Sequence, residues 1–326
     1  MAIPTNTYTR VSAGANGVGP VREDLIEKIT LTNPWETPVI KDAGRGVAKN
    51  TYHEFMRDSL RAANKDNAAL DGDDAVAAAK VRPSRVANTC QIFQDTIQVS
   101  GRSQAVDTAG MKNPLAYYKG KAYKELQRDM EAAVVSKNVA VEDNGTVAGK
   151  LAGLGRMIYT NAFHGVGGAT PAHTSGAATT AITAGTNRAF TEALLKPAIQ
   201  QTYVNSGQVP QDLYMSPAHK ELFSGFPGIA SQRADVPKGK QATITSGADV
   251  YVSNFGMITI IPHYLMAGSD FVLGLNTQYI DMVYLRSFNS TPLNKSGDND
   301  KEQVLVDATL RVTSEVAQFK IDNLIP

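Results

Sequence analysis

The sequence predicts an α+β fold in which one long helix lies among β-rich segments. Between Asn113 and Val141, apolar residues recur every three or four positions, which is the spacing of one continuous helical face. The charged residues of this stretch, Glu131 among them, are expected on the opposite, solvent-facing side. Residues 304–319 alternate between apolar and polar side chains, which is typical of a half-buried strand. The segments that flank the helix are rich in Thr, Val, Ile and Phe, which favour strands. We therefore expect a spine helix with thin sheets packed on it, and not one member of a helix bundle.

Composition limits the class of protein. The 326 residues, 42% hydrophobic and 19% charged, indicate a folded protein of two lobes or of one domain with large excursions. A formal net charge of +1 gives no whole-molecule field that would hold nucleic acid or an anionic membrane. The single cysteine, Cys90, excludes an intrachain disulfide framework and is expected to be a small buried hydrophobe. We expect neither a membrane span nor a signal peptide, and synthesis in the cytosol.

The N-terminal region predicts an arm. Residues 1–22 are mostly small and polar, so they cannot order themselves by burying apolar surface. Arg22–Thr32 is expected to form a short amphipathic helix, which Asn33–Pro38 ends because a residue before proline is held extended. Trp35, the only tryptophan, lies in this break. The arm either lies on another molecule or packs Trp35 on its own core, and composition leaves both open.

A long two-stranded ribbon follows the arm. Lys49–Arg57 and Val86–Val99 are predicted as its strands, and residues 62–80 between them are mostly Ala, Asn and Asp. The tip of the ribbon carries the acidic residues Asp71, Asp73 and Asp74. An isolated two-stranded hairpin is barely stable in water, so the ribbon should rest on a neighbouring surface. At about 3.3 Å per residue its arms reach some 40 Å from the body, which favours contact with another subunit.

The rest of the chain predicts alternating short strands and helices. Helices are expected at Thr191–Asn205, with a kink at Pro197, and at 216–226, where Ser216 caps and Pro217 takes the first helical position. Residues 164–185 are expected to form a surface loop, and 289–300 a turn-rich connection. Strands are expected at Leu151–Asn161, Asp212–Met215, Asp249–Ser253, Met257–Pro262, Phe271–Leu275, Ile280–Phe288 and Val304–Phe319.

Motifs that would carry chemistry are weak throughout. The glycine clusters near Gly153 and Gly165 lack the strand–GxGxxG–helix context of a phosphate-binding loop. The acidic stretches 71–74 and 298–300 resemble calcium loops without a Glu at the twelfth position, so solvated turns are expected. The five histidines have no metal-binding spacing, and we expect no enzyme, no cofactor and no metal site. These histidines are His53, His164, His173, His219 and His263, of which His219 is expected to be a surface or capping residue and not a catalytic base.

The order of these segments resembles the HK97-like major capsid proteins of tailed bacteriophages, over essentially the whole chain. Local strings are similar to one branch of phage coat proteins. They are Arg22–Leu25 leading to Pro34–Pro38, Asn88–Phe93, Val99–Gly101, Lys124–Asp129, and the ending Val304–Leu324.

The resemblance implies a domain plan: an N-terminal arm (1–45), an extended β-ribbon loop (46–104), a peripheral domain (105–185 and 270–326) with the spine helix at about 113–142, and an axial domain (186–269). It implies hexamers and pentamers that build an icosahedral or prolate head shell around double-stranded DNA, with weak non-specific DNA contact and no membrane. Scaffolding, portal and decoration proteins would be separate chains. The expected location is the virion capsid, with assembly in the host cytoplasm. Trp35, Asp71, Asp73, Asp74 and Phe93 are the expected subunit-interface residues.

Three alternatives remain open from the sequence. An encapsulin-like nanocompartment shell would have the same fold and would hold cargo enzyme. A tail or adhesion protein would fit the Thr/Ser/Gly-rich stretches but should show repeats, which this chain lacks. A hydrolase that uses Cys90 would need a base supplied by the fold.

Overall fold

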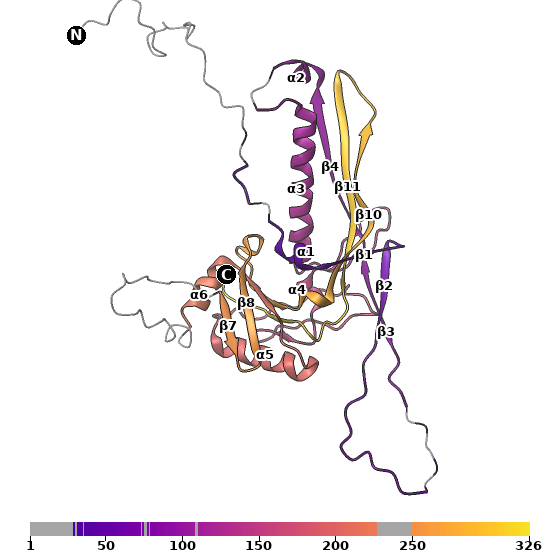
Figure 1. The fold of residues 1–326 in the computed structure, drawn as a ribbon, viewed down its shortest axis with the longest axis vertical. Coiled ribbons are helices and arrows are strands. Elements are labelled where there is room, and N and C mark those ends of the chain that lie inside the picture. The colour runs from indigo at the N-terminus through magenta and orange to yellow at the C-terminus, as the bar shows by residue number, and fades with distance from the viewer. Residues whose placement is uncertain are drawn as a thin grey trace, which may run out of the picture.

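The computed structural model describes residues 29, 31–34, 36–72, 74, 77, 79–107, 110–226 and 249–326 (Figure 1). The N-terminal arm before residue 29, nearly all of the helix expected at Arg22–Thr32, Trp35 and Asp73 lie outside the described residues. In the described ranges, every helix is too short or too polar to cross a lipid bilayer.

The spine helix packs on a four-stranded sheet. The helix α3 (Pro114–Val134) lies beside β4 (Gln91–Ser100) and β11 (Asn299–Val312), and the sheet continues through β10 (Ile280–Leu293) to β1 (Gly44–Val47) (Figure 1). Strands β4, β11 and β10 are antiparallel, and β1 joins β10 in parallel. The apolar face of α3 is buried in the larger hydrophobic core at Ala122, Leu126, Met130 and Val134.

The start of α3 and the alternation in β11 are as the sequence predicts. Asn113 caps the helix, its Oδ1 accepting a hydrogen bond from Ala116 N at 3.1 Å, and Pro114 takes the first position. From Val304 to the end of β11, every second residue has a fully hidden side chain, so one face of this part of the strand forms core. These residues are Val304, Val306, Ala308, Leu310 and Val312.

The second sheet has six strands in the order β5-β12-β9-β6-β8-β7. The helices α5 (Glu192–Ser206) and α6 (Pro217–Ser224) accompany it, and Ser216 caps α6 by accepting from His219 N at 3.2 Å. A separate hydrophobic core joins the helices to the sheet through Leu195, Ile199, Phe223, Ile258 and Phe319. The strands are β5 (Ala162–Phe163), β12 (Phe319–Ile321), β9 (Val272–Leu275), β6 (Asp212–Met215), β8 (Gly256–Pro262) and β7 (Val250–Ser253).

Short elements complete the fold. β2 (Tyr52–Arg57) and β3 (Ser84–Thr89) form a two-stranded sheet of their own. The short helices are α1 (Pro38–Asp42), α2 (Gly101–Ala105), α4 (Leu154–Met157), η1 (Tyr264–Met266) and η2 (Thr277–Tyr279).

The spine helix ends at Val134, seven residues earlier than the sequence predicts. The backbone after it is bound by a distant segment: Gly155 N donates to Ser136 O at 3.0 Å, and Gly153 N donates to Asn138 O at 3.1 Å. A Cβ on Gly153 would lie 2.3 Å from Ser136 O, so only glycine permits this approach. Hydrogen bonds to this distant segment replace those that a longer helix would make.

The strand predicted at Leu151–Asn161 is wrong. These residues contain the helical turn α4, and the next strand, β5, begins only after them. The run is apolar because it is buried between the spine helix and the second sheet; Leu151, Leu154 and Met157 are all fully hidden. Apolar runs of this length do not distinguish a strand from a buried turn.

Three other boundaries differ from prediction. The strand expected at Val86–Val99 is two strands, because the chain leaves β3 at Cys90 and enters the spine-helix sheet as β4. The connection expected at 289–300 is mostly strand, since pairs such as Leu293↔Lys301 extend the β10–β11 hairpin. The strand expected at 304–319 divides between the sheets, with β11 in the first and β12 in the second. The domain boundaries stay a prediction.

Candidate functional site

The extended loop between β2 and β3 is the most exposed described part of the subunit. Every described residue from 58 to 83 is exposed, including Leu60 at 97% and Leu70 at 79%. The loop projects away from both sheets (Figure 1). Asp71 and Asp74 lie near its tip and are exposed, whereas Asp73 lies outside the described residues. A two-stranded excursion of this kind is barely stable in water by itself, which favours a neighbouring surface that covers it.

Asn88 fixes the base of this loop to the body. Its side chain is fully buried on β3, where Nδ2 donates to Leu310 O at 2.9 Å and to Ala152 O at 3.3 Å. Its Oδ1 accepts from Ala152 N at 2.8 Å and from Thr89 N at 3.0 Å. All four hydrogen-bonding positions of the amide are therefore used. The loop projects from a rigid joint between β3, β11 and the segment before α4.

Arg57 strengthens the same joint at the end of β2. Its Nη2 donates to Val312 O at 2.5 Å, and its guanidinium lies over the Phe55 ring at 5.6 Å. Burial lowers the pKa of Arg57, while the charge of Glu315 raises it. Glu315 itself accepts hydrogen bonds from Tyr159 N at 3.4 Å and from the Thr160 hydroxyl at 2.5 Å.

Glu131 anchors the segment through which the N-terminal arm joins the body. Its Oε1 accepts from Val39 N at 2.8 Å and its Oε2 from Ile40 N at 2.9 Å, at the start of α1. His263 Nε2 lies 2.8 Å from Glu131 Oε1, and both side chains are fully buried. The sequence pattern places Glu131 on the solvent-facing side of the spine helix, which is wrong. Because Glu131 lies three residues before Val134, it shares the buried face.

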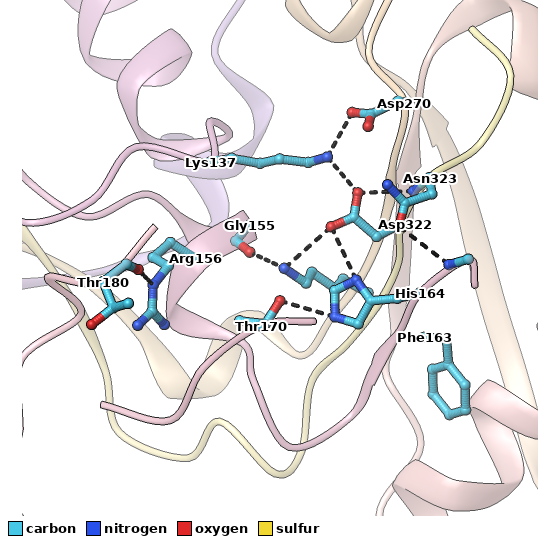
Figure 2. Close-up of polar contacts among 12 residues, drawn as sticks. Lys137, Gly155, Arg156, Phe163, His164, Thr170, Thr180, Asp270, Asp322 and Asn323 are labelled. Carbon is cyan, nitrogen blue, oxygen red and sulfur yellow. Dashed lines mark hydrogen bonds and ion pairs between the residues drawn. The ribbon is translucent and has the colours of Figure 1, made fainter. Parts of the chain in front are cut away.

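A buried polar network ties the end of the spine helix to the second sheet (Figure 2). Lys137 Nζ contacts Asp270 Oδ1 at 2.6 Å and also the carboxylate of Asp322. On β12, the fully buried Lys320 donates to Gly155 O at 2.5 Å and lies 3.5 Å from Asp322 Oδ2. Burial lowers the pKa of Lys320 to about 8. Burial by itself raises the pKa of Asp322, but the hydrogen bond from Lys137 and the charge of Lys320 lower it overall.

The segment 164–185 is a loop with mostly exposed or half-buried residues, as expected, and it also takes part in this network. His164 is mostly buried, with Nδ1 at 3.6 Å from Asp322 Oδ2 (Figure 2). Asn323 Oδ1 accepts from Gly165 N at 3.2 Å. A Cβ on Gly165 would lie 1.9 Å from Thr186 O, so the low-complexity sequence allows close packing of backbone.

A groove of about 920 Å³ lies where the arm segment, the spine helix and the first sheet meet. Pro38 and Lys41 of α1, Gln127 of α3, and Tyr284 and Phe288 of β10 contribute to its lining. This groove is a second candidate contact surface, beside the segment through which the N-terminal arm joins the body.

The structure separates the predicted interface residues. Phe93 is only 7% exposed on β4 and belongs to the same core as Leu126 and Val306, so it has a core role and not the interface role predicted. Asp71 and Asp74 are exposed in the extended loop, and Trp35 and Asp73 lie outside the described residues. The interface role of these four stays a prediction.

Two residues outside that set bear on chemistry. Cys90 is buried as predicted, and burial raises the pKa of its thiol to about 11. His219, expected on the surface or as a cap, is fully buried, with Nδ1 at 2.8 Å from Ser216 Oγ and Nε2 at 3.0 Å from Ile325 O.

The arrangement of spine helix, extended loop and two sheets is that of HK97-like capsid proteins. A solved structure of the cyanophage A-1(L) capsid asymmetric unit superimposes with a TM-score of 0.63 at 12% identity, covering 93% of this chain and 97% of that one. The holo-SrpI encapsulin complex from Synechococcus elongatus PCC 7942 gives a TM-score of 0.51 at 10% identity, covering 94% and 93%. These likenesses establish the HK97-like α+β fold.

The chain belongs to the SU10 major capsid protein family, whose model matches residues 3–324. It is also 22% identical to the major capsid protein of Escherichia phage Phieco32 over 321 residues, 87% of this chain and 88% of that protein. The protein is therefore a major capsid protein, a structural component of a phage head shell located in the virion capsid.

Proposed function

We propose that this subunit assembles into hexamers and pentamers, and that these build an icosahedral or prolate shell around double-stranded DNA. The observation that carries the proposal is the extended loop, whose described residues are all exposed while its base is fixed by Asn88 and Arg57. A rigid joint aims the loop, and a second subunit supplies the surface that covers it.

Geometry favours rings of subunits. The loop and the groove beside the arm are different surfaces, so a contact between one subunit's loop and its neighbour's body is heterologous, and repetition closes rings. Each contact is small, but several made together give a shell much firmer than any one of them. In this proposal residues 1–45 form the arm, 46–104 the loop, 105–185 and 270–326 the peripheral domain, and 186–269 the axial domain that meets its copies.

The proposed role is structural and without catalysis. At neutral pH a thiol with a pKa near 11 is almost entirely protonated, so Cys90 is a poor nucleophile, which argues against the hydrolase alternative. Lys and Arg side chains on the inner face give the packaged DNA weak, sequence-independent contact that falls with salt. Assembly in the host cytoplasm, with separate scaffolding, portal and decoration proteins, completes the proposal.

The test removes the loop without disturbing its base. Arg57 pairs with Ser84 across β2 and β3, so replacing residues 58–83 with Asn-Gly leaves a two-residue turn in register. We expect this variant to fold with a melting temperature close to that of the wild type, because every described residue in the deleted range is exposed. Electron microscopy with negative stain should show shells or capsomers for the wild type and only free subunits for the variant.

Shells formed by the loop-deleted protein would refute the proposal. A Cys90→Ala variant is the control, which should assemble normally because the thiol has no part in it. The encapsulin alternative is decided by the contents of native particles: packaged DNA supports the head shell, and a cargo enzyme without a genome supports the nanocompartment.

A further inference from the structure

Arg156 has an unusual environment for a charged residue. It lies in α4 with its side chain fully buried, and Nε donates to Thr180 O at 2.6 Å. Both terminal nitrogens, Nη1 and Nη2, are buried and have no hydrogen-bond partner among the described residues. The guanidinium points away from the Lys137–Asp322 network (Figure 2). A buried cation without a counter-charge is strongly unfavourable, so this group is built to meet an anion.

The nearby carboxylates are already engaged. Asp322 is shared between Lys137 and Lys320, and Glu315 accepts from Tyr159 and Thr160. Cations outnumber anions here, since Arg57, Arg156, Lys137 and Lys320 face Asp270, Asp322 and Glu315. Neither Arg156 nor Arg57 forms an ion pair with the described residues. The charge of Glu315 raises the pKa of Arg57, whereas burial alone lowers the pKa of Arg156, so no nearby carboxylate balances the Arg156 guanidinium.

Arg57 and a neutral His173 lie close to Arg156. The His173 ring packs on Tyr159 with centroids 4.7 Å apart, and burial together with the charges of Arg57 and Arg156 lowers the pKa of His173 to about 4. Arg57 Nε is also buried without a hydrogen-bond partner. Residues 174–181, which contact Arg156 through Thr180 O, consist only of Gly, Ala, Ser and Thr, so none of their side chains carries a charge that could pair with the guanidinium.

We propose that Arg156 anchors a binding site for a small tetrahedral oxyanion such as inorganic phosphate, beside residues 174–181 at the base of the extended loop. Two parallel N–H donors of a planar guanidinium match two oxygens of such an ion. A free ion fits this place better than the carboxylate of another subunit, because a whole side chain would have to enter a site whose anchor has no exposed surface. The bound ion would hold residues 174–181 to α4.

Phosphate binding tests this directly on the full-length protein. Equilibrium dialysis with radiolabelled phosphate should give about one ion per wild-type subunit and none for Arg156→Met. The melting temperature of the wild type should rise by about 5 °C at a hundredfold excess of phosphate over its Kd. Without phosphate, Arg156→Met should melt at or above the wild-type temperature, because it removes an unpaired buried charge.

Controls separate this site from general salt effects. Phosphate stabilises many proteins because it is excluded from the protein surface. Buffers are therefore matched in ionic strength with chloride, and the phosphate is kept at a few millimolar. Arg85→Met removes an exposed arginine at the base of the extended loop. This variant should still bind one phosphate and should show the same rise in melting temperature as the wild type. If Arg156→Met does not fold, Arg156→Lys keeps the charge without the planar fork and should bind at least tenfold more weakly.

Equal phosphate uptake by the wild type and the Arg156 variants would overturn the proposal, as would a wild type without uptake. The readout is independent of the assembly role, since it is measured equally on free subunits and on shells.

Discussion

At the scale of single residues, one carboxylate connects three parts of the subunit. Glu131 of the spine helix binds the start of α1 and the buried His263 beside η1. A single buried acid thus determines where the segment leading to the N-terminal arm leaves the body. In the sequence, only its position three residues before Val134 on the helix indicates that Glu131 is buried.

We expect Glu131→Ala to destabilise the subunit by about 3–5 kcal/mol, because His263 and two backbone N–H groups lose their buried partner. Urea unfolding gives the free energy, and hydrogen exchange should rise at residues 38–43. The matched control is Glu125→Ala on the same helix, whose pair with Lys121 is nearly half exposed. It should change the stability by less than about 0.5 kcal/mol. Equal effects of the two substitutions would contradict the anchor role of Glu131.

The buried His173 should make the stability of the folded subunit depend on pH. Burial, followed by the charges of Arg57 and Arg156, lowers its folded-state pKa from 6.5 to about 4. Between pH 4 and 6.5 the unfolded chain therefore binds more protons, so stability rises with pH across this window and this contribution is constant above it. Its size is at most about 3 kcal/mol.

Urea unfolding in phosphate-free buffers checks this expectation. The wild type should lose stability from pH 6.5 to 4 more steeply than His173→Gln, and the two curves should run parallel above pH 6.5. Parallel curves over the whole range would show that His173 titrates normally in the folded protein.

At the scale of elements, the spine helix is stabilised by its packing on β4 and β11. Leu126 is 2% exposed at the centre of that contact, and Leu126→Ala should cost about 2–5 kcal/mol through lost burial and a residual cavity. Gln127 is the next residue along the helix and is exposed. Gln127→Ala should lie within about 0.5 kcal/mol of the wild type in the same urea titration. A small effect of Leu126→Ala would mean that the sheet closes over the gap.

Local signals explain which elements sequence reasoning could place. A capping residue followed by proline predicts the start of α3 at Asn113-Pro114 and of α6 at Ser216-Pro217. The alternation of apolar and polar residues predicts the buried face of β11. The end of α3 was not predictable in this way, because it depends on hydrogen bonds from Gly153 and Gly155, which are distant in sequence.

The buried polar residues cannot be predicted from local sequence either. Arg156, Lys320 and Asp322 come from segments whose proximity only the folded chain creates, and their residue types are usually exposed. The glycines in residues 164–185 predict a loop, and local sequence does not show that Gly165 and Gly185 are sites of close backbone packing. The exposed loop is predictable because residues 62–80 are mostly Ala, Asn and Asp, which supply too little apolar surface for a core.

At the scale of the whole molecule, the acidic tip of the extended loop should bind basic groups on a neighbour. Reversing Asp71, Asp73 and Asp74 to Lys should raise the protein concentration needed for assembly at low salt. The difference should shrink at 1 M salt, where charges are screened within about 3 Å. Light scattering and sedimentation measure the threshold. Lysine at the exposed Glu142 and Asp143 is the control for added positive charge. Tips that assemble equally well after reversal would rule out this contact.

The order of strands has a consequence for how the polypeptide is made. β11 lies between β10 and β4, and β12 lies between β5 and β9, yet both follow their neighbours along the chain. Neither sheet is complete until these late strands have left the ribosome, since domains form only when their parts have been synthesised. A nascent chain interrupted before β11 has two open sheets and lacks Lys320 and Asp322. Such fragments expose unpaired strand edges. We therefore expect incomplete chains to be degraded by proteases and not to be incorporated into shells.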